Sequence, residues 1–222
     1  MDKELWTAVD QYTTDRLLPA DPALEAALEA SEAAGLPSIS VSPSQGKMLM
    51  LLAQLAGASR ILEIGTLGGY SSIWLARSLK AGGRLITLEA NPKHAEVARA
   101  NIAHAGFASV VEVRLGDARA GIEHLVAEAA APFDLIFIDA DKSSIPHYVE
   151  WSLKLSHRGT LIIVDNVIRE GALIDAKSKD ASVQGVRRLH EMLAAEPRLN
   201  ATTIQTVGSK GYDGFALFVV TH

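Results

Sequence analysis

From Arg60 onward, short apolar runs alternate with stretches of helical length, and this alternation constrains the fold more than any other feature. The apolar runs, read as strands, lie at 60–64, 84–89, 109–115, 133–138 and 160–165. The helical stretches lie at 70–81, 92–105, 118–129 and 145–156. Strands separated by helix-length connections pair in parallel through right-handed crossovers. The sequence therefore predicts an α/β fold in which helices cover both faces of a sheet.

The C-terminal part of the chain adds a reversed strand to this sheet. Two more apolar runs, 201–207 and 214–221, are separated by only the turn at 208–213. So short a connection forces an antiparallel hairpin. Together the runs predict a doubly wound, seven-stranded, mostly parallel sheet with one antiparallel strand, which is a Rossmann-like arrangement. Between residue 166 and the hairpin, a long polar loop (167–181) precedes a helix (182–195).

The N-terminal residues form a helical extension. The segments 3–18 and 22–34 read as two helices, and Ser42-Pro43 opens a third, since proline favours the first helical turn. No linker or repeat divides the chain, so we expect one domain over 1–222, with 1–37 as the extension. The two extra helices are not needed for a minimal nucleotide-binding sheet, and we expect them to cover the active site or to form a dimer face.

Composition excludes several classes of function. The 222 residues carry a net charge of −5 and no basic tract, which argues against nucleic acid or an anionic membrane as a partner. There is no cysteine, so thiolate metal sites and thiol nucleophiles are absent. No apolar run reaches the roughly 20 residues that span a bilayer. The charged start of the chain does not resemble a signal peptide, and a cytoplasmic location is the expectation by elimination.

Polar side chains follow two of the expected strands at the point where each strand ends. Asp139 and Lys142 follow 133–138, and Asp165 with Asn166 closes the strand at 160–165. The carboxyl ends of parallel strands meet at one crevice, so these side chains converge. Carboxylate and amide oxygens suit a hard cation such as Mg²⁺ or Ca²⁺, and a lysine beside it could act as a base. We interpret Asp141, between them, as a solvated loop carboxylate.

A glycine-rich stretch, EIGTLGGYS from Glu63 to Ser71, lies between the first strand and its helix. Glycines there allow a tight turn and close approach of the backbone to a ligand. Glu89 ends the next strand, where a carboxylate can accept hydrogen bonds from a ribose. The dinucleotide fingerprint requires a glycine where this chain has Leu67. The carboxylate of Glu63 would repel a pyrophosphate but attract an ammonium or sulfonium group, which favours S-adenosylmethionine over NAD.

These residues resemble those of a known family. The stretches ILEIGTLGGYS (61–71), FIDADK (137–142) and VDNV (164–167) are similar to motifs of the cation-dependent O-methyltransferases of the caffeoyl-CoA and catechol type. That family has the class I S-adenosylmethionine-dependent fold, and the resemblance runs from about residue 38 to the last strand. It departs from the family at Ile145, where an aromatic residue is common, so the shape of the acceptor is in question.

The resemblance implies a role for each matching residue. It implies Lys142 as the general base. The implied metal ligands are Asp139, Asp165 and Asn166, with Mg²⁺ as the expected ion and Ca²⁺ or Mn²⁺ as alternatives. The implied cofactor-binding residues are Val41, Glu63, Gly65, Thr66, Ser71, Glu89, Asp117, Ala118 and Asp139. Asp117 could instead simply cap the helix that begins at Ala118, and both roles can hold together.

The function expected on these grounds is transfer of a methyl group from S-adenosylmethionine to one of two adjacent hydroxyls of a catechol-type small molecule. A divalent cation would favour ionisation of that hydroxyl, and members of the family are commonly homodimers. Two alternatives remain open at this point. One is methylation of another acceptor, such as a hydroxylated RNA base or a non-catechol metabolite. The other is a nicotinamide-dependent oxidoreductase, which Glu63 and Leu67 disfavour.

Overall fold

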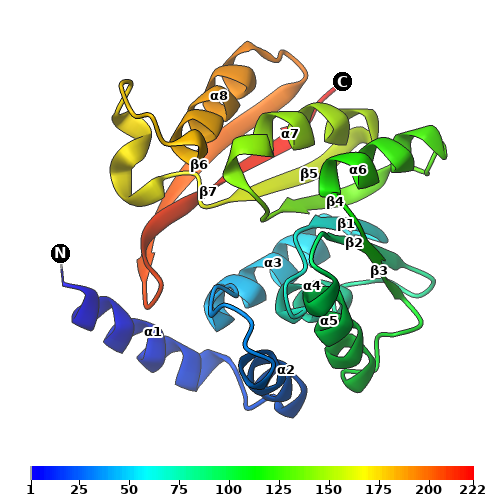
Figure 1. Ribbon diagram of the computed structural model, residues 1–222, viewed down its shortest axis with the longest axis vertical. Helices are drawn as coiled ribbons and strands as arrows, with labels where there is room; N and C mark the ends of the chain where they lie inside the picture. Colours follow the sequence, from blue (N-terminus) through cyan, green and yellow to red (C-terminus); the bar gives the residue numbers. More distant parts are fainter. Residues whose placement is uncertain (1) are drawn as a thin grey trace.

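The computed structural model describes residues 2–222 and contains one twisted sheet of seven strands in the order β3-β2-β1-β4-β5-β7-β6 (Figure 1). The strands are β1 (Arg60–Ile64), β2 (Arg84–Glu89), β3 (Val111–Leu115), β4 (Phe133–Ile138), β5 (Ser156–Asp165), β6 (Leu199–Gly208) and β7 (Gly211–Val220). Strands β1 to β5 pair in parallel, and β7 is antiparallel to both of its neighbours. The predicted fold class, with one reversed strand, is confirmed.

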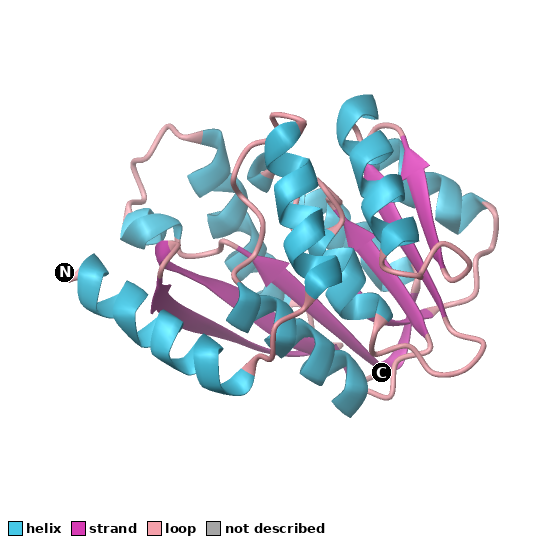
Figure 2. Cartoon of the chain, turned by 90° about the horizontal axis from the view of Figure 1, so that it is seen from below, coloured by secondary structure: helices cyan, strands magenta, loops and turns pink. Residues whose placement is uncertain are grey.

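Helices cover both faces of this sheet (Figure 2). They are α1 (Lys3–Leu17), α2 (Pro22–Ala33), α3 (Pro43–Leu55), α4 (Tyr70–Ala76), α5 (Pro92–His104), α6 (Ala118–Ala127), α7 (Ile145–Lys154) and α8 (Ala181–Ala195), with short 3₁₀ turns η1 (Lys142–Ser144) and η2 (Arg169–Ile174). Side-chain oxygens of Asp21, Ser42, Asn91 and Asp180 accept hydrogen bonds from backbone N–H groups of the first turns that follow them. Such caps satisfy donors that have no partner inside the helix, and they fix where each helix begins. Within residues 2–222, no helix is both long and apolar enough to cross a membrane.

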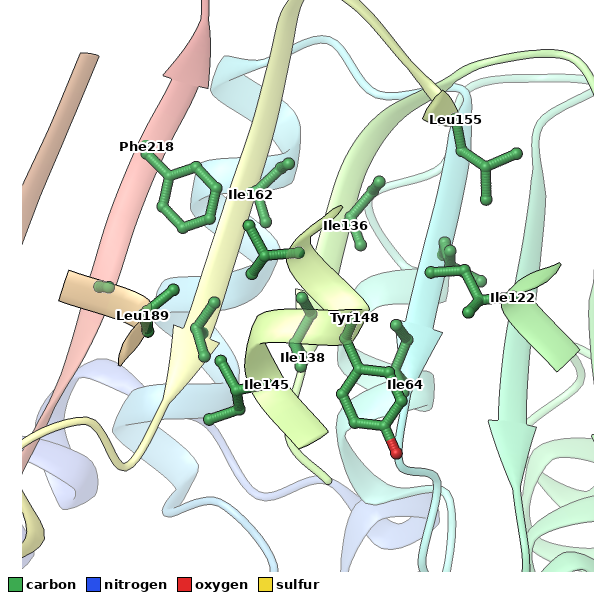
Figure 3. Close-up of a cluster of buried hydrophobic side chains, with 14 of the residues drawn as sticks. Ile64, Ile122, Ile136, Ile138, Ile145, Tyr148, Leu155, Ile162, Leu189 and Phe218 are labelled. Carbon is green, nitrogen blue, oxygen red and sulfur yellow. The ribbon is translucent and has the colours of Figure 1, made fainter. Parts of the chain in front are cut away.

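Alternation along the central strands divides the core into two layers. On β4, Ile136 and Ile138 pack with α6, α7 and α8, whereas Leu135 and Phe137 pack with α3, α4 and α5. Figure 3 shows the first layer, where isoleucines of β1, β4 and β5 meet the α7 residues Ile145 and Tyr148. A strand buried on both faces is apolar along its whole length, which is why these runs were readable in the sequence.

Several predicted boundaries differ from the structure, most of them by one to three residues. Helix α4 ends at Ala76 rather than 81, because Ser78 and Leu79 switch to hydrogen bonds that span only three residues. Strand β3 starts at Val111 rather than 109, since the preceding residues form a turn. Strand β5 starts earlier than predicted, at Ser156, through a polar segment that pairs irregularly with β4. The carboxyl ends of β1 to β5, where the candidate site lies, are at the predicted residues.

The reversed strand places the β6–β7 turn beside that end of the sheet. The register pairs Asp165, the last residue of β5, with Phe215 of β7. Because β7 runs opposite to β5, the residues before Phe215 extend past the end of β5 toward the loops. The turn contains only Ser209 and Lys210, since Gly208 still pairs with Gly211. It is therefore shorter than the 208–213 segment expected from the sequence.

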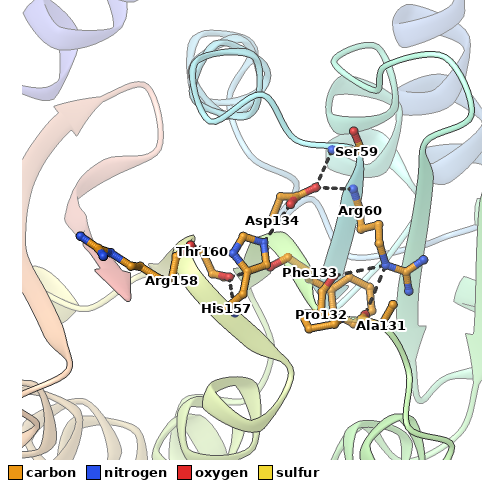
Figure 4. A network of polar contacts seen from close by, with 9 residues as sticks. All are labelled: Ser59, Arg60, Ala131, Pro132, Phe133, Asp134, His157, Arg158 and Thr160. Atoms are coloured by element: carbon orange, nitrogen blue, oxygen red, sulfur yellow. Dashed lines mark hydrogen bonds and ion pairs between the residues drawn. The ribbon is translucent and has the colours of Figure 1, made fainter. Parts of the chain in front are cut away.

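At the opposite end of the sheet, one partly buried carboxylate links three strands (Figure 4). Asp134 of β4 accepts hydrogen bonds from the backbone N–H groups of Ser59 and Arg60, at 2.7 and 2.9 Å. His157 of β5 lies 3.0 Å from the other oxygen of Asp134. Burial raises the pKa of Asp134, but these hydrogen bonds outweigh it and leave the pKa below its usual value. The network links β1, β4 and β5 at their amino-terminal ends.

We expect His157→Gln to destabilise the protein in a pH-dependent way. Hydrogen bonds to the carbonyl of Arg158 and to Asp134 raise the pKa of His157. The stabilisation by protonated His157 is therefore complete below its unfolded pKa of about 6.5 and is lost as the pH rises through the folded value. The side chain of His157 is 44% exposed, so the effect should be small. We expect the substitution to lower the free energy of unfolding, measured in urea, by less than about 1 kcal/mol at pH 5.5 and by less than that at pH 9. A difference that does not change with pH would contradict this role.

Candidate active site

A cavity of about 580 Å³ opens at the carboxyl ends of β1, β2 and β4, where ligands bind in sheets of this kind. It is bounded by the segment before α3, the glycine loop after β1 and the loops after β2, β3 and β4. Ten of the residues predicted for the site line it: Val41, Gly65, Thr66, Ser71, Glu89, Asp117, Ala118, Asp139, Lys142 and Asn166. The other two, Glu63 and Asp165, lie behind its wall, and both are buried.

The glycine loop is held against the loop after β4. Gly65 has φ +100°, a backbone conformation that residues with a side chain rarely adopt. A Cβ at this position would lie 2.1 Å from the carbonyl oxygen of Asp139. A glycine is therefore required here for two independent reasons. The close approach brings the glycine loop and the Asp139 loop into one site.

Glu63 lies beneath the loop rather than on the cavity wall. Its side chain is fully buried and accepts hydrogen bonds from the hydroxyls of Ser71, at 2.6 Å, and of Ser72. Burial raises the pKa of Glu63 to about 7, although the two serine hydroxyls favour the ionised form. Ser71 lines the cavity, so the charge of Glu63 reaches a ligand through this hydroxyl and at short range.

Glu89 has a structural role in addition to the one predicted for it. One of its carboxylate oxygens accepts hydrogen bonds from the backbone N–H groups of Thr66 (3.2 Å) and Leu67 (2.9 Å). The other accepts from the N–H of Asn91 at 2.9 Å. Glu89 therefore fixes the shape of the glycine loop while its side chain faces the cavity. Asp117 likewise combines two positions. It caps α6 by accepting a hydrogen bond from the N–H of Ala120 at 3.0 Å, and it also lines the cavity.

Lys142 and Asp139 form an ion pair in the wall of the cavity. The ammonium group of Lys142 lies 2.8 Å from Oδ1 of Asp139, and only 10% of the lysine side chain is exposed. Lys142 forms no ion pair with the neighbouring carboxylate of Asp141. Asp141 instead accepts hydrogen bonds from the N–H of Ser144 and, at 2.6 Å, from the hydroxyl of Tyr148. Asp141 therefore stabilises the η1 turn, which begins at Lys142.

The backbone of Lys142 is held by α8. A Cβ on Gly185 would lie 2.1 Å from the carbonyl oxygen of Lys142, so α8 packs directly on the η1 turn. Glycine inside a helix costs roughly 1 kcal/mol relative to alanine. The close packing accounts for its presence in α8.

Asp165 and Asn166 complete the group at the end of β5. Asp165 is 5% exposed, and burial together with the negative charge of Asp139 raises its pKa, while Lys142 opposes the shift. Gln45 of α3 donates a hydrogen bond to Oδ2 of Asp165 at 2.6 Å. Asn166 has φ +56°, a left-handed conformation that asparagine tolerates better than most residues. This backbone turn brings Asn166 into the cavity wall directly after the buried Asp165.

The side chains at this point fit a hard cation. No group of three or more His, Asp or Glu side chains in residues 2–222 is arranged to hold a metal. The predicted ligand set has only two carboxylates, Asp139 and Asp165, and takes its third oxygen from the amide of Asn166. Burial is the main cause of the raised pKa of Asp165, and the negative charge of Asp139 adds to it. A buried carboxylate in that situation favours a nearby positive charge.

A second cavity, of about 290 Å³, adjoins the first on the other side of Asn166. Its walls come from α1, α3, the loop after β5 and the β6–β7 hairpin, and they include Asp165, Gln45 and Tyr212. Asp10 of α1 closes this side by accepting a hydrogen bond from the N–H of Ser209 at 2.7 Å. Sequence reasoning missed Gln45, Asp10 and Tyr212. For Asp10, the one signal in the sequence was the expectation that the two N-terminal helices cover the site. The sequence held no comparable signal for Gln45 or Tyr212.

The sheet order, the glycine loop after β1 and the acidic side chains at the ends of the first two strands define a Rossmann-like, cofactor-binding enzyme. A family model described as O-methyltransferase matches residues 19–217. The chain belongs to the O-methyltransferase family. This membership confirms the resemblance and the enzyme class predicted from the sequence.

Individual relatives agree with this assignment over nearly the whole chain. A catechol O-methyltransferase of Niastella koreensis is 53% identical over 220 residues, which are 99% of this chain and 100% of the relative. The solved O-methyltransferase from Bacillus cereus, in complex with SAH, is 59% identical with a TM-score of 0.97, covering 98% of this chain and 99% of that one. TomG of Streptomyces achromogenes, solved with SAM, is 51% identical with a TM-score of 0.97 over 100% of both chains.

Proposed function

We propose that this enzyme transfers a methyl group from S-adenosylmethionine to one of two adjacent hydroxyls of a catechol-type small molecule, with the help of a divalent cation. One observation carries the proposal: two cavities meet at Asn166, and the side chains of Asp139, Lys142 and Asp165 gather at their junction. A methyl donor and a methyl acceptor need two such adjoining spaces. The names of the relatives support this assignment of donor and acceptor.

The larger cavity would hold the methyl donor. The bound donor supplies an electrophilic methyl group on a positively charged sulfur. Negative charge from Glu63, relayed by Ser71, suits the ammonium and sulfonium end. Glu89 and Asp117 lie where hydrogen bonds to a ribose and an adenine are expected, and the volume of about 580 Å³ is in the range of cofactor sites. Family membership favours this donor over a nicotinamide.

The cation would be held by Asp139, Asp165 and Asn166, with Mg²⁺ as the expected ion and Ca²⁺ or Mn²⁺ as alternatives. When bound, it favours the ionised form of an acceptor hydroxyl, whose pKa is otherwise about 10 by analogy with tyrosine. Lys142 would take the proton of that hydroxyl while in its neutral amine form, which the positive charge of a nearby cation favours. The close approach of Gly65 to the backbone of Asp139 would place the glycine loop beside this cation site.

The smaller cavity would hold the acceptor. Its volume of about 290 Å³ suits a single substituted aromatic ring rather than a polymer. The net charge of −5 gives no support to a hydroxylated RNA base as the acceptor. Met48, Tyr212 and Phe215 supply apolar and aromatic surface for a ring.

Two measurements test the proposal. Titration calorimetry should show binding of S-adenosylmethionine and none of NAD. Methylation of 3,4-dihydroxycinnamic acid should require Mg²⁺ and stop in excess EDTA. Binding of NAD alone would refute the donor, and undiminished turnover in EDTA would refute the cation. A panel of catechol and monohydroxy acceptors then separates a vicinal diol from other hydroxyl groups.

We also propose a homodimer that uses α1, in an enzyme that works in the cytoplasm. The apolar side chains of Leu5, Val9, Tyr12 and Leu17 on α1 are each more than half exposed. A helix with so much unburied apolar surface favours a partner, and a second copy of the chain is the occupant that the family resemblance implies. Sedimentation equilibrium should give twice the chain mass of 23.7 kDa, and a monomer would refute this part of the proposal.

A further inference from the structure

Gln45 contacts Asp165, which lies far from it in the sequence. Its side-chain amide donates a hydrogen bond to Oδ2 of Asp165 at 2.6 Å, between residues 120 positions apart. The other oxygen of Asp165 accepts the backbone N–H of Asn166 at 2.8 Å. Each carboxylate oxygen therefore has one donor, and together the two donors set the plane of the carboxylate. Of these donors, only the Gln45 amide comes from a side chain.

The position of Gln45 is itself fixed by the packing of α3. The hydroxyl of Ser42 accepts the backbone N–H of Gln45 at 3.2 Å, so this residue lies in the capped first turn. The next residue, Gly46, lies so close to α4 that a Cβ would be 2.3 Å from the Trp74 ring. Leu49, one turn further on, is fully buried. The helix therefore presents the amide from a rigid base.

The chemistry of an amide suits this position. A lysine would neutralise Asp165, and an ionised glutamate would repel it. Glutamine donates a hydrogen bond but carries no charge, so the negative charge of Asp165 stays available to a cation. Asp165 is 5% exposed, and a buried carboxylate oxygen without a donor is destabilised by its loss of hydration. The hydrogen bond from Gln45 therefore also stabilises Asp165.

We propose that Gln45 is a positioning residue for the divalent cation, acting through Asp165, which it holds in the orientation that the cation requires. This rests on the proposed function, since it takes Asp165 as a metal ligand. Partners of metal ligands typically contribute 10- to 100-fold to metal affinity. Gln45 itself lines the smaller cavity, and the segment just before α3 lines the larger one through Val41.

The test is titration of the enzyme with Mn²⁺, followed by electron paramagnetic resonance of the free ion. Gln45→Met keeps the length of the side chain and removes the donor, and we expect it to weaken Mn²⁺ binding by about 10-fold or more. Gln54→Met is the matched control, because Gln54 lies on the same helix and is exposed. The control should bind Mn²⁺ within twofold of the wild type. In both variants, calorimetry should give the wild-type affinity for S-adenosylmethionine.

The outcomes separate this inference from the proposed function. If the wild type binds no Mn²⁺, the metal centre itself is wrong and the inference falls with it. If the wild type binds and Gln45→Met binds equally well, only the role of Gln45 is refuted. Equal weakening in Gln54→Met would also refute it, because the loss would then reflect helix α3 in general. The increase in melting temperature on adding Mn²⁺ gives a second readout, and it should shrink only in Gln45→Met.

Discussion

Asp139→Ala should lose at least about 10³-fold in kcat, because it removes the one carboxylate that both lines the donor cavity and pairs with Lys142. A cation at a reacting oxygen contributes several kcal/mol to transition-state stabilisation, and each 1.4 kcal/mol corresponds to about tenfold in rate. The measurement is the initial rate of methyl transfer over a range of Mg²⁺ concentrations. Added Mg²⁺ should not restore the variant, because the ligand itself is missing.

The control for this variant is Asp175→Ala, the same substitution at an exposed carboxylate of the loop before α8. It should keep wild-type turnover and the same response to Mg²⁺. Wild-type activity in Asp139→Ala would show that no cation is required at this point. Circular dichroism and the melting temperature would confirm that each variant is folded.

Lys142→Ala should lower kcat by about 10²- to 10⁴-fold, which is the usual contribution of a general base. Its side chain is 90% buried and is aimed at Asp139, so it lies at the junction of the two cavities rather than in solvent. The affinity for S-adenosylmethionine should change by less than about threefold, because the other cofactor-binding residues are untouched. Single-turnover rates and calorimetry separate these two effects.

Lys142→Arg provides the discriminating companion. Arginine keeps the positive charge and the pairing with Asp139 but does not release a proton in proteins. If Lys142 acts as the base, Lys142→Arg should remain as slow as Lys142→Ala. If the lysine serves only to orient Asp139, arginine should restore most of kcat. An unchanged kcat in Lys142→Ala would remove this residue from the reaction.

Most of the fold could be predicted because the central strands are buried on both faces. Strands β2 and β4 begin and end at the predicted residues, 84–89 and 133–138, since their inner residues, 85–88 and 135–138, are all buried and are flanked on both sides by charged residues. The errors fall where local hydrogen bonding competes with the pattern. The early part of β5 is polar and exposed, so nothing in its composition distinguished it from a loop.

The site was predictable to the extent that it follows the sheet. Asp139, Lys142 and Asn166 come directly after strands, and the topology alone brings them to one cavity. Gln45 was not predictable, because a glutamine near the start of a helix reads as a surface residue and its partner is 120 positions away. The same holds for the hydrogen bonds of Glu89 to the glycine loop, which depend on the loop's conformation rather than on its composition.

The surroundings of Glu63 are ordered when the protein folds, before any ligand binds. Its carboxyl group is fully buried, and the hydroxyls of Ser71 and Ser72 donate hydrogen bonds to it without the help of a ligand. The burial of this carboxyl group, and the ordering of the hydroxyls around it, therefore belong to the folding reaction. A cationic ligand that binds later favours the ionised form of a group whose partners are already in place, so little of its affinity is spent on ordering them.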